Sequence, residues 1–457
     1  MKGETMKSYS PLLLAIVLVA AASVTGRASE PEGLFRLTDD GAWCWYQDER
    51  AIIHQGKLLV GSVACGKQDQ TRQGDINLTL FDLKTKKSVQ IELHDRLQPD
   101  DHNVPGLLAI PDGRVLAVYS KHGPENKFYY RISQQDNLTK WTPVKDFVPS
   151  KTSHITYSNL HYLQKENAGN GRVYNFFRGL NGSNKPSYAF SDDQGENWNT
   201  GNIVINFPSS FKHRPYVKYA SNGKETIHLL YTDAHPRNFN NNIYHIYYRN
   251  KMLYRSDGSV IGPLAKGLNN PGEGTLIFRG DSNNIGWTSD LHLSEDGQAY
   301  AVCTVRKNSA GQTIKEYGND LRYRYAWWDG KKWNDQEIAH AGTRLYPVEY
   351  DYTGNICLNP DDLNQVFIST DADPVTGKAL ISNADSKRHY EIFQGVTNDG
   401  GKNFRWTAIT SNSTVDNLRP IVPKWNKKQT MLLWYRGTYR TYTDYKTEVV
   451  GVILKKD

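Results

Sequence analysis

Two segments about 206 positions apart share one pattern, and this long-range copy constrains the fold more than any other feature. "SDDQGENW" (191–198) and "TNDGGKNF" (397–404) both follow the frame Ser/Thr-x-Asp-x-Gly-x-x-aromatic. This Asp-box pattern is typical of a tight turn between two strands, in which Asp caps the turn and Gly allows a positive φ. About twenty residues later each copy continues with an Arg-Pro pair, at Arg214 and Arg419, and an apolar strand. Such units are what the blades of a β-propeller leave in a sequence.

Further hairpins with the same rhythm are predicted along the chain. Each joins two β-rich runs through a Gly-containing turn, as in "AIIHQGKLLVGSV", "LLAIPDGRVLAVY", "HLSEDGQAYAVCTV" and "YAWWDGKKWNDQEI". The 28 Tyr, 14 Phe and 11 Trp also favour strands. At about 50 to 60 residues per blade, the chain has room for seven or eight blades. We predict an all-β fold, a single seven-bladed β-propeller over residues 29–457; two β-sandwiches would not explain the long-range copy.

The N-terminus has the features of a secretory signal peptide. Lys2 and Lys7 precede an apolar run from Leu12 to Val24, and small residues stand at positions 26 and 28. The thirteen apolar residues of this run are too few to span a bilayer. We predict a signal peptide over residues 1–28, a secreted or periplasmic protein, and no membrane partner.

Charge favours an acidic substrate over nucleic acid. Removing the three cations and one anion of the leader from the formal charge of +7 leaves +5, and a mildly basic exported protein suits a polyanion. The Lys and Arg residues are spread without a basic block, so we predict no nucleic-acid partner. The four cysteines lack zinc-type spacing, and both disulfides and buried free thiols are compatible with them: Cys44, Cys65, Cys303 and Cys357.

One predicted hairpin carries a histidine at each end. In "DDHNVPGLLAIPDGRVLAVYSKHG" (100–123), His102 precedes the first strand and His122 follows the second. The two ends of a hairpin opposite its turn lie side by side. We therefore expect both imidazoles to face one point, on the propeller face where loops from several blades converge.

Longer segments resemble the BNR-repeat-like secreted proteins, whose characterised members include ulvan lyases and an unusual α-L-rhamnosidase family. The resemblance runs from about Gly41 to the C-terminus and includes "GAWCWYQDERA", the two-histidine hairpin, "HRPYVKYASNGKETIHLLYTDAHPRN" and "NSTVDNLRPIV". It implies a seven-bladed propeller. The resemblance to the ulvan lyases also implies a site like theirs, formed by two histidines about twenty residues apart, a Tyr and an Arg.

The resemblance assigns residues of this chain to that site. His102 and His122 match the histidine pair, the Tyr falls on Tyr157 or else Tyr162, and the Arg falls on Arg178. A second Tyr corresponds to Tyr216 or Tyr219, and Tyr216 is favoured because it directly follows the Arg-Pro pair. His213 and Arg214 are neighbouring candidates for substrate binding, although the repeat position that Arg214 shares with Arg419 favours a structural role for both.

These residue types suit β-elimination. A lyase removes the proton alpha to a uronate carboxylate and expels the oxygen at C4, so a fixed cation must neutralise the carboxylate, and Arg178 fits that task. His102, His122 and Tyr157 can exchange the protons, in an order that the sequence leaves open. We predict cleavage of an acidic, ulvan-like polysaccharide of rhamnose and uronate by a monomer that requires no cofactor. A structural divalent metal is compatible with the fold, but no ligand set is legible.

Three alternatives stay open. In an exo-α-L-rhamnosidase, His54 in "RAIIHQGKLL" would serve as the general acid on the opposite face. Glycosidases usually need two carboxylates, for which "VEYDY" (Glu349, Asp351) is a weak candidate. A sialidase would need an Arg-Ile-Pro motif that is absent, and a non-catalytic glycan-binding propeller would use the abundant aromatic residues.

Overall fold

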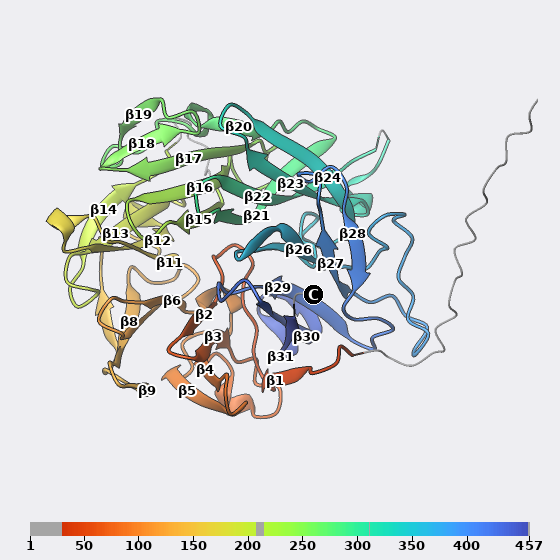
Figure 1. The fold of residues 1–457 in the computed structure, drawn as a ribbon, viewed down its shortest axis with the longest axis horizontal. Coiled ribbons are helices and arrows are strands. Elements are labelled where there is room, and N and C mark those ends of the chain that lie inside the picture. Colours follow the sequence, from red (N-terminus) through yellow and green to blue (C-terminus); the bar gives the residue numbers. More distant parts are fainter. Residues whose placement is uncertain (1–29, 207–213, 310, 456–457) are drawn as a thin grey trace, which may run out of the picture.

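Seven antiparallel sheets make up the computed structural model, which describes residues 30–206, 214–309 and 311–455. The sheets follow one another along the chain and surround a common centre (Figure 1). The predicted all-β, seven-bladed propeller is therefore confirmed. The predicted signal peptide (1–28) and His213 lie outside the described residues.

The first four blades are formed by consecutive strands. Blade 1 contains β2 (Ala51–His54), β3 (Lys57–Val63), β4 (Ile76–Asp82) and β5 (Ser88–His94). Blade 2 contains β6 (Gly106–Ala109), β7 (Val115–Tyr119), β8 (Phe128–Gln134), β9 (Asn137–Trp141) and β10 (Lys145–Phe147). Blade 3 contains β11 (Thr156–Leu163), β12 (Arg172–Arg178), β13 (Pro186–Ser191) and β14 (Asn199–Ile203). Blade 4 contains β15 (Val217–Ser221), β16 (Thr226–Thr232), β17 (Ile243–Arg249), β18 (Met252–Arg255), β19 (Val260–Pro263) and β20 (Thr275–Phe278).

Three more blades complete the ring. Blade 5 contains β21 (Asn284–Leu293), β22 (Ala299–Lys307), β23 (Leu321–Trp328) and β24 (Trp333–Gly342). Blade 6 contains β25 (Ile356–Asn359), β26 (Asp362–Thr370), β27 (Glu391–Val396) and β28 (Arg405–Ala408). Blade 7 contains β29 (Asp416–Ile421), β30 (Gln429–Thr441), β31 (Asp444–Lys455) and β1 (Phe35–Thr38). Short 3-10 turns lie in the connections: η1 (Gln70–Arg72), η2 (Asp101–Asn103), η3 (Asn167–Gly169), η4 (Leu180–Gly182), η5 (Pro271–Glu273) and η6 (Ile314–Glu316).

Blade 7 joins the two ends of the chain. β1 pairs antiparallel with β31, Phe35 opposite Gly451, and the Phe35 ring stacks on Phe81 of blade 1 at 4.6 Å. Figure 1 shows β1 beside β31 at the bottom of the ring. Pairing the first strand with the last closes the ring by hydrogen bonds and removes an exposed strand edge.

Both Asp-box turns have the predicted geometry. Each connects the third and fourth strands of a blade, β13 to β14 in blade 3 and β27 to β28 in blade 6. The Ser191 hydroxyl accepts a hydrogen bond from the Gly195 amide at 2.8 Å, and the Thr397 hydroxyl accepts one from Gly401 at 2.9 Å. Both glycines have a positive φ, +92° and +85°, which a side chain would disfavour. The predicted hairpins are also confirmed, as β2–β3, β6–β7, β21–β22 and β23–β24.

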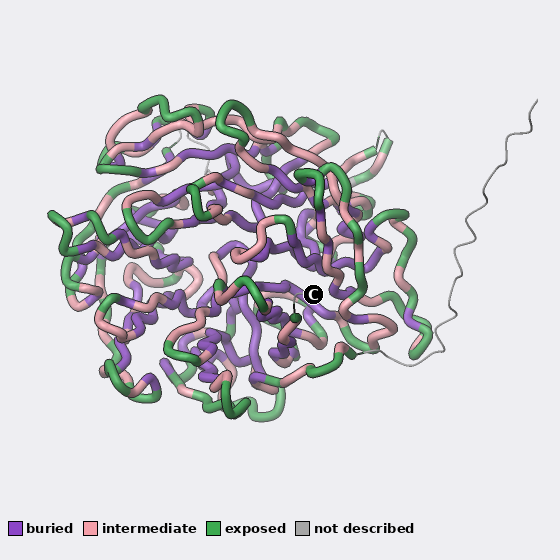
Figure 2. Tube along the Cα trace, in the orientation of Figure 1, coloured by how far each residue is buried: buried purple, intermediate pink, exposed green. Residues whose placement is uncertain are grey.

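The centre of the ring is occupied by residues 43–50, which we call the central segment. The Tyr46 ring packs on Trp287 of blade 5 at 4.5 Å and on Tyr216 beside blade 4 at 4.7 Å. Further along, the Asp48 amide donates to Asn159 of blade 3 at 2.9 Å. Figure 2 shows the buried parts of the chain near the centre and the exposed parts at the rim. Tyr46 of the central segment lines one space and Asp48, Glu49 and Arg50 line another; we call the region around the ring axis that contains both spaces the central channel.

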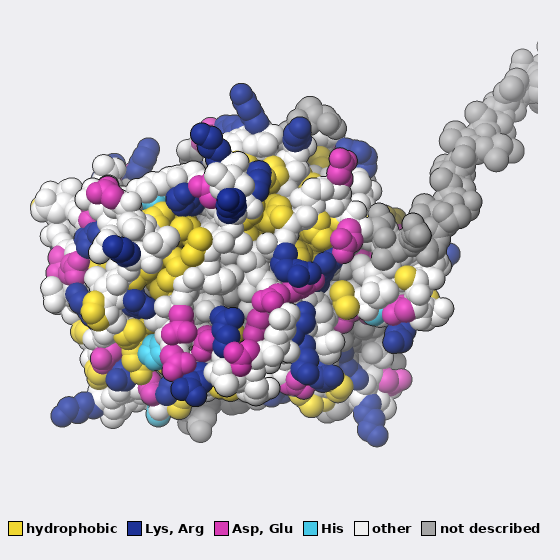
Figure 3. All heavy atoms as spheres, turned by 90° about the horizontal axis from the view of Figure 1, so that it is seen from below, with side chains coloured by type: hydrophobic (Ala, Val, Ile, Leu, Met, Phe, Trp, Pro, Cys, Tyr) yellow, Lys and Arg dark blue, Asp and Glu magenta, His cyan; other side chains and the backbone are white. Residues whose placement is uncertain are grey.

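All four cysteines are free thiols, and Cys44, Cys303 and Cys357 are buried. On the face in Figure 3, basic and acidic side chains are interspersed. None of the helices in the described parts of the chain has the length and apolar character needed to cross a membrane.

Candidate active site

Two stacked imidazoles lie where the ends of the β6–β7 hairpin meet. His102 belongs to η2, just before β6, and His122 follows β7. Their ring centroids are 3.9 Å apart and their planes differ by 13°. We call the face at which the first strand of each blade begins the front, and the opposite face the rear. The expectation that both imidazoles face one point on a loop-rich face agrees with this geometry.

One carboxylate joins the two rings. Asp100 Oδ1 accepts from His102 Nδ1 at 2.6 Å, and Asp100 Oδ2 accepts from His122 Nδ1 at 2.9 Å. These bonds fix both ring orientations and turn each Nε2 away from Asp100. His102 is 4% exposed and His122 is 23% exposed, so His122 is the imidazole that a ligand can reach.

A buried ion pair holds the η2 turn in place. Arg419 donates to Asp101 Oδ2 at 2.8 Å and also bonds the Trp43 carbonyl, and both charged side chains are 0% exposed. The Tyr439 hydroxyl donates to the same Asp101 oxygen at 2.6 Å. Because Asp101 adjoins His102, this contact ties the histidine pair to blade 7. The structural role predicted for Arg419 fits this position.

Tyr157 approaches the imidazoles from blade 3. Its ring centroid is 5.5 Å from that of His102 and 6.2 Å from that of His122. The register of β11 shifts between Thr156 and Asn159, and Tyr157 has φ +60°, a left-handed conformation that costs energy for a residue with a side chain. Strain of this kind concentrates at functional sites. Of the two tyrosines considered from the sequence, Tyr162 lies farther along β11, packed against another core cluster.

Arg178 lies at the end of β12, paired with Thr156 of β11. Its guanidinium carbon is 4.6 Å from the centre of the Tyr157 ring, and Nη1 donates to the Tyr216 hydroxyl at 3.4 Å. The side chain is buried, and among the described residues no carboxylate lies within ion-pair distance of it. A space of about 20 Å³ lies among Tyr157, Arg178 and Tyr216. An uncompensated buried cation beside such a space favours an anionic ligand atom.

The other residues considered from the sequence fall in different places. Tyr219 lines both the space beside Arg178 and a separate cavity, and its amide donates to Asp48. Arg214 is half-buried and lies near His235, whose ring packs edge-on against Tyr216 at 5.5 Å. His54 lies at the rear end of β2, with Nε2 2.9 Å from the Gly113 carbonyl oxygen. Glu349 and Asp351 are paired with arginines, Arg237 and Arg306 respectively.

Three residues of this site were not assigned from the sequence. Asp100 stands in the "DDHN" motif, so its proximity to His102 was visible, but its contact with His122 was not. Tyr442 places its ring edge against both imidazoles, at 5.0 and 5.6 Å, and comes from the turn between β30 and β31. Tyr46 belongs to the central segment and contacts Tyr157 and Tyr216. The last two come from distant segments, and nothing in the sequence joins them to the histidines.

The pKa values of the two imidazoles are shifted in opposite directions. Burial and the positive charge of His102 lower the pKa of His122 to about 4. Burial alone would lower the pKa of His102, but the neighbouring Cys44 and the Asp100 carboxylate offset it, and the pKa of His102 is raised well above 6.5. At neutral pH the pair therefore carries one positive charge, on His102, and His122 is neutral. Burial raises the pKa of Tyr157 well above 10, so its phenol stays protonated.

Donor groups that could hold a metal occur at both ends of the channel. On the front, Asp100, His102 and His122 lie close together, but both Nδ1 atoms already bond Asp100. Cys44 and Asp101 also lie beside His102, but Asp101 Oδ2 is held by Arg419 and Tyr439. Toward the rear, Glu49, Asp290 and His292 form a third group.

Comparison with known proteins gives a family and a set of similar folds. The family of BNR repeat-containing members matches residues 44–341. No curated protein sequence matches the chain. A solved ulvan lyase bound to a glucuronic acid (1-4) rhamnose 3-sulfate unit has a TM-score of 0.63 at 14% identity, covering 93% of this chain and 95% of that one. A second solved polysaccharide lyase has a TM-score of 0.59 at 12% identity, covering 94% and 100%. At this identity the likeness shows that the propeller fold is shared.

Proposed function

We propose that this chain, which belongs to the BNR repeat-containing family, is a polysaccharide lyase that cleaves next to a uronate by β-elimination. The observation that carries this proposal is Arg178, a buried guanidinium without a carboxylate partner among the described residues, one tyrosine ring away from a neutral imidazole. A fixed cation and a nearby base are what elimination alpha to a carboxylate requires.

Arg178 binds the substrate carboxylate in this proposal. The space of about 20 Å³ beside it has room for one water-sized group, such as a carboxylate oxygen. The Tyr216 hydroxyl, which already accepts from Arg178, lies on the same space and can donate to that oxygen. Neutralising the carboxylate makes the alpha proton more acidic and stabilises the enolate-like state that follows its removal.

His122 is the general base. It is neutral at pH 7 because its pKa is about 4, its Nδ1 donates to Asp100, and its Nε2 is left with a lone pair. His102 carries the positive charge that keeps His122 neutral, and so it tunes the base. Arg419, through Asp101, positions this pair and does not touch the substrate.

Tyr157 is the general acid. Its phenol stays protonated at neutral pH, and its ring lies between the imidazoles and Arg178. His122 takes the proton from C5, the C4–O bond breaks as the C4=C5 bond forms, and the departing oxygen takes the Tyr157 proton. The products are an unsaturated uronate at one end and a free hydroxyl at the other, with no water consumed.

The substrate class follows from the site and from its relatives. The site favours a polymer that carries carboxylates, and the mildly basic charge of the chain is complementary to a polyanion. The solved ulvan lyase with a similar fold is bound to a unit of glucuronic acid and sulfated rhamnose. We therefore propose an ulvan-like polysaccharide of rhamnose and glucuronate as the substrate of an exported enzyme.

The direct test is the appearance of unsaturated uronate. We expect absorbance at its ultraviolet band to rise when the purified protein is incubated with ulvan. His102→Ala should abolish the rise while the circular dichroism spectrum stays that of the wild type. Substantial activity in that variant would refute the assignment.

The same assay decides the hydrolase alternative. Release of rhamnose without absorbance would replace the lyase proposal with an exo-α-L-rhamnosidase that uses His54. Binding without either product would indicate a non-catalytic propeller.

A further inference from the structure

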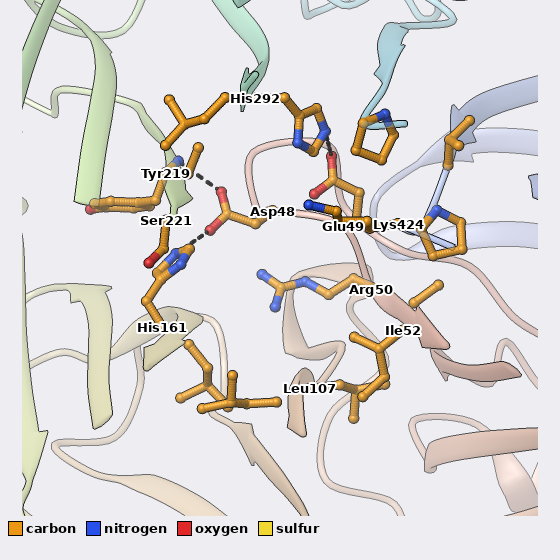
Figure 4. A pocket seen from close by; sticks show the side chains of 18 residues that line it. Asp48, Glu49, Arg50, Ile52, Leu107, His161, Tyr219, Ser221, His292 and Lys424 are labelled. Atoms are coloured by element: carbon orange, nitrogen blue, oxygen red, sulfur yellow. Dashed lines mark hydrogen bonds and ion pairs between the residues drawn. The ribbon is translucent and has the colours of Figure 1, made fainter. Parts of the chain in front are cut away.

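The rear half of the central channel contains a cavity that the proposed lyase chemistry does not use. It has a volume of about 370 Å³ and is lined by residues of all seven blades. Figure 4 shows Asp48, Glu49 and Arg50 of the central segment entering it from one side, with His161 and His292 facing them. Asp48, Glu49 and Arg50 belong to the "WYQDER" motif (45–50), and Tyr46 of the same motif faces the front site.

Three donor atoms converge beside this cavity: Glu49 and His292 line it, and Asp290 is buried behind them. His292 Nε2 lies 3.4 Å from Glu49 Oε1 and 3.3 Å from Asp290 Oδ2. His292 Nε2 is itself buried and makes no hydrogen bond with good geometry among the described residues. Two carboxylate oxygens and an imidazole nitrogen thus lie at ion-pair distance around one point, and Asp290 Oδ2 also accepts a hydrogen bond from the Leu358 amide.

The spacing of these atoms suits a tetrahedral metal ion. Zinc bonds to imidazole nitrogen and carboxylate oxygen are about 2.0 to 2.1 Å long, which places neighbouring tetrahedral ligand atoms about 3.3 to 3.4 Å apart. The two measured separations fall in that range. A calcium ion would need more oxygen ligands and rarely takes imidazole, whereas one nitrogen and two oxygens suit zinc.

The backbone of β21 and its neighbours fixes the positions of the donor residues. The register of β21 shifts between Thr288 and Asp290, and this bulge precedes the two ligand positions, 290 and 292, which alternate onto the same side of the strand. The Asp290 carboxylate accepts from the Leu291 amide at 2.8 Å and from the Leu358 amide of blade 6 at 2.9 Å. Hydrogen bonds of this kind orient metal-ligating carboxylates.

We propose that Glu49, Asp290 and His292 bind a zinc ion, which ties the central segment to blade 5 and leaves its fourth ligand position open to the rear cavity. A second imidazole in the same cavity provides the contrast. His161 Nε2 pairs with Asp48 Oδ2 at 3.1 Å, but the other Asp48 oxygen accepts from the Tyr219 amide and no second carboxylate joins the described cluster.

Zinc binding to the chelator-stripped full-length protein tests this proposal. We expect one zinc per chain in a competition titration against a chromophoric chelator, and an intense tetrahedral absorption spectrum when cobalt(II) is added instead. His292→Ala should weaken zinc binding by at least about 100-fold. Glu49→Gln, which keeps the size of a half-buried side chain, should do the same.

Two controls make the result decisive. His161→Ala removes an imidazole from the same cavity and should change zinc affinity by less than about threefold, and His102→Ala should also leave it unchanged. The proposal is overturned if the folded wild type binds no zinc, if His292→Ala and Glu49→Gln bind it normally, or if His102→Ala alone abolishes binding. Circular dichroism of each variant confirms that the fold is retained.

Discussion

The front site and the rear cavity are two ends of one channel, and each combines imidazoles with carboxylates in a different way. On the front, His102 and His122 stack at 3.9 Å and share Asp100, beside a space of about 20 Å³. At the rear, His292 contacts two carboxylates at 3.3 and 3.4 Å, beside a cavity of about 370 Å³. The central segment between them contributes Tyr46 to one end and Glu49 to the other.

The difference lies in the ratio of charges. The two imidazoles that share Asp100 carry one positive charge between them, so the other ring is a base at neutral pH, and Arg178 adds a cation whose hydrogen-bond partner is the neutral Tyr216 hydroxyl. Two carboxylates on one imidazole carry excess negative charge and attract a cation. We infer that the same residue types are arranged for proton transfer at the front and for metal binding at the rear.

The largest predicted effect is on lyase turnover, which should depend on the front site and not on the rear cluster. His122→Ala should lower the lyase turnover number by about 10³-fold, because it removes the base. His292→Ala should lower it by less than about threefold. Initial rates of unsaturated uronate formation measure both, and equal losses in the two variants would break the distinction between the ends.

The second prediction concerns the anchor of the front site. Arg419→Met should lower the free energy of unfolding by about 3 to 5 kcal/mol, because it leaves the Asp101 carboxylate buried without its charge partner. Arg214→Met, at the equivalent repeat position but half-buried, should change it by less than about 0.5 kcal/mol. Urea denaturation measures both, and similar losses of unfolding free energy would mean that the two arginines have the same structural role.

The third prediction sharpens the charge argument through pH. Turnover should fall about tenfold per unit as pH drops below about 4, because protonation of His122 removes the base. In His102→Ala, the pKa of the His122 imidazole, followed by NMR titration, should move up toward the ordinary histidine value of about 6.5, since the neighbouring positive charge is gone. An unchanged His122 titration in that variant would show that His102 does not tune His122.

The smallest predicted effect lies in turns that touch neither end. Ser191→Ala in blade 3 and Thr397→Val in blade 6 each remove a buried hydroxyl that accepts a glycine amide. Each should lower the free energy of unfolding by about 0.5 to 1.5 kcal/mol and leave turnover unchanged. Thermal unfolding and the uronate assay check the pair, and a loss of turnover only in blade 3 would implicate that blade's turn in the front site.

Local sequence signals account for the parts of the fold that could be predicted. The Asp-boxes and the Gly-containing hairpins depend on residues within about ten positions of each other, so the strand content of the blades followed from them. The number of blades came from the chain length and the family resemblance. The closure of blade 7 by β1 joins Phe35 to Gly451, and no local pattern marks that pairing.

The same reasoning explains which site residues could be found. His102 and His122 were brought together because both belong to one hairpin, whereas the roles of Tyr157 and Arg178 came from a family resemblance. The cluster of Glu49, Asp290 and His292 joins the central segment to β21 of blade 5, about 240 positions away in the sequence. Only the closed ring places them together, and the β21 bulge that precedes Asp290 has no sequence signature.

Product analysis after reaction in heavy-oxygen water tests the central claim most directly. If Arg178, His122 and Tyr157 carry out β-elimination, mass spectrometry of ulvan fragments should show an unsaturated uronate end and no heavy oxygen at the cleaved bond. Saturated fragments with one heavy oxygen at each newly formed reducing end would demonstrate hydrolysis and contradict the account.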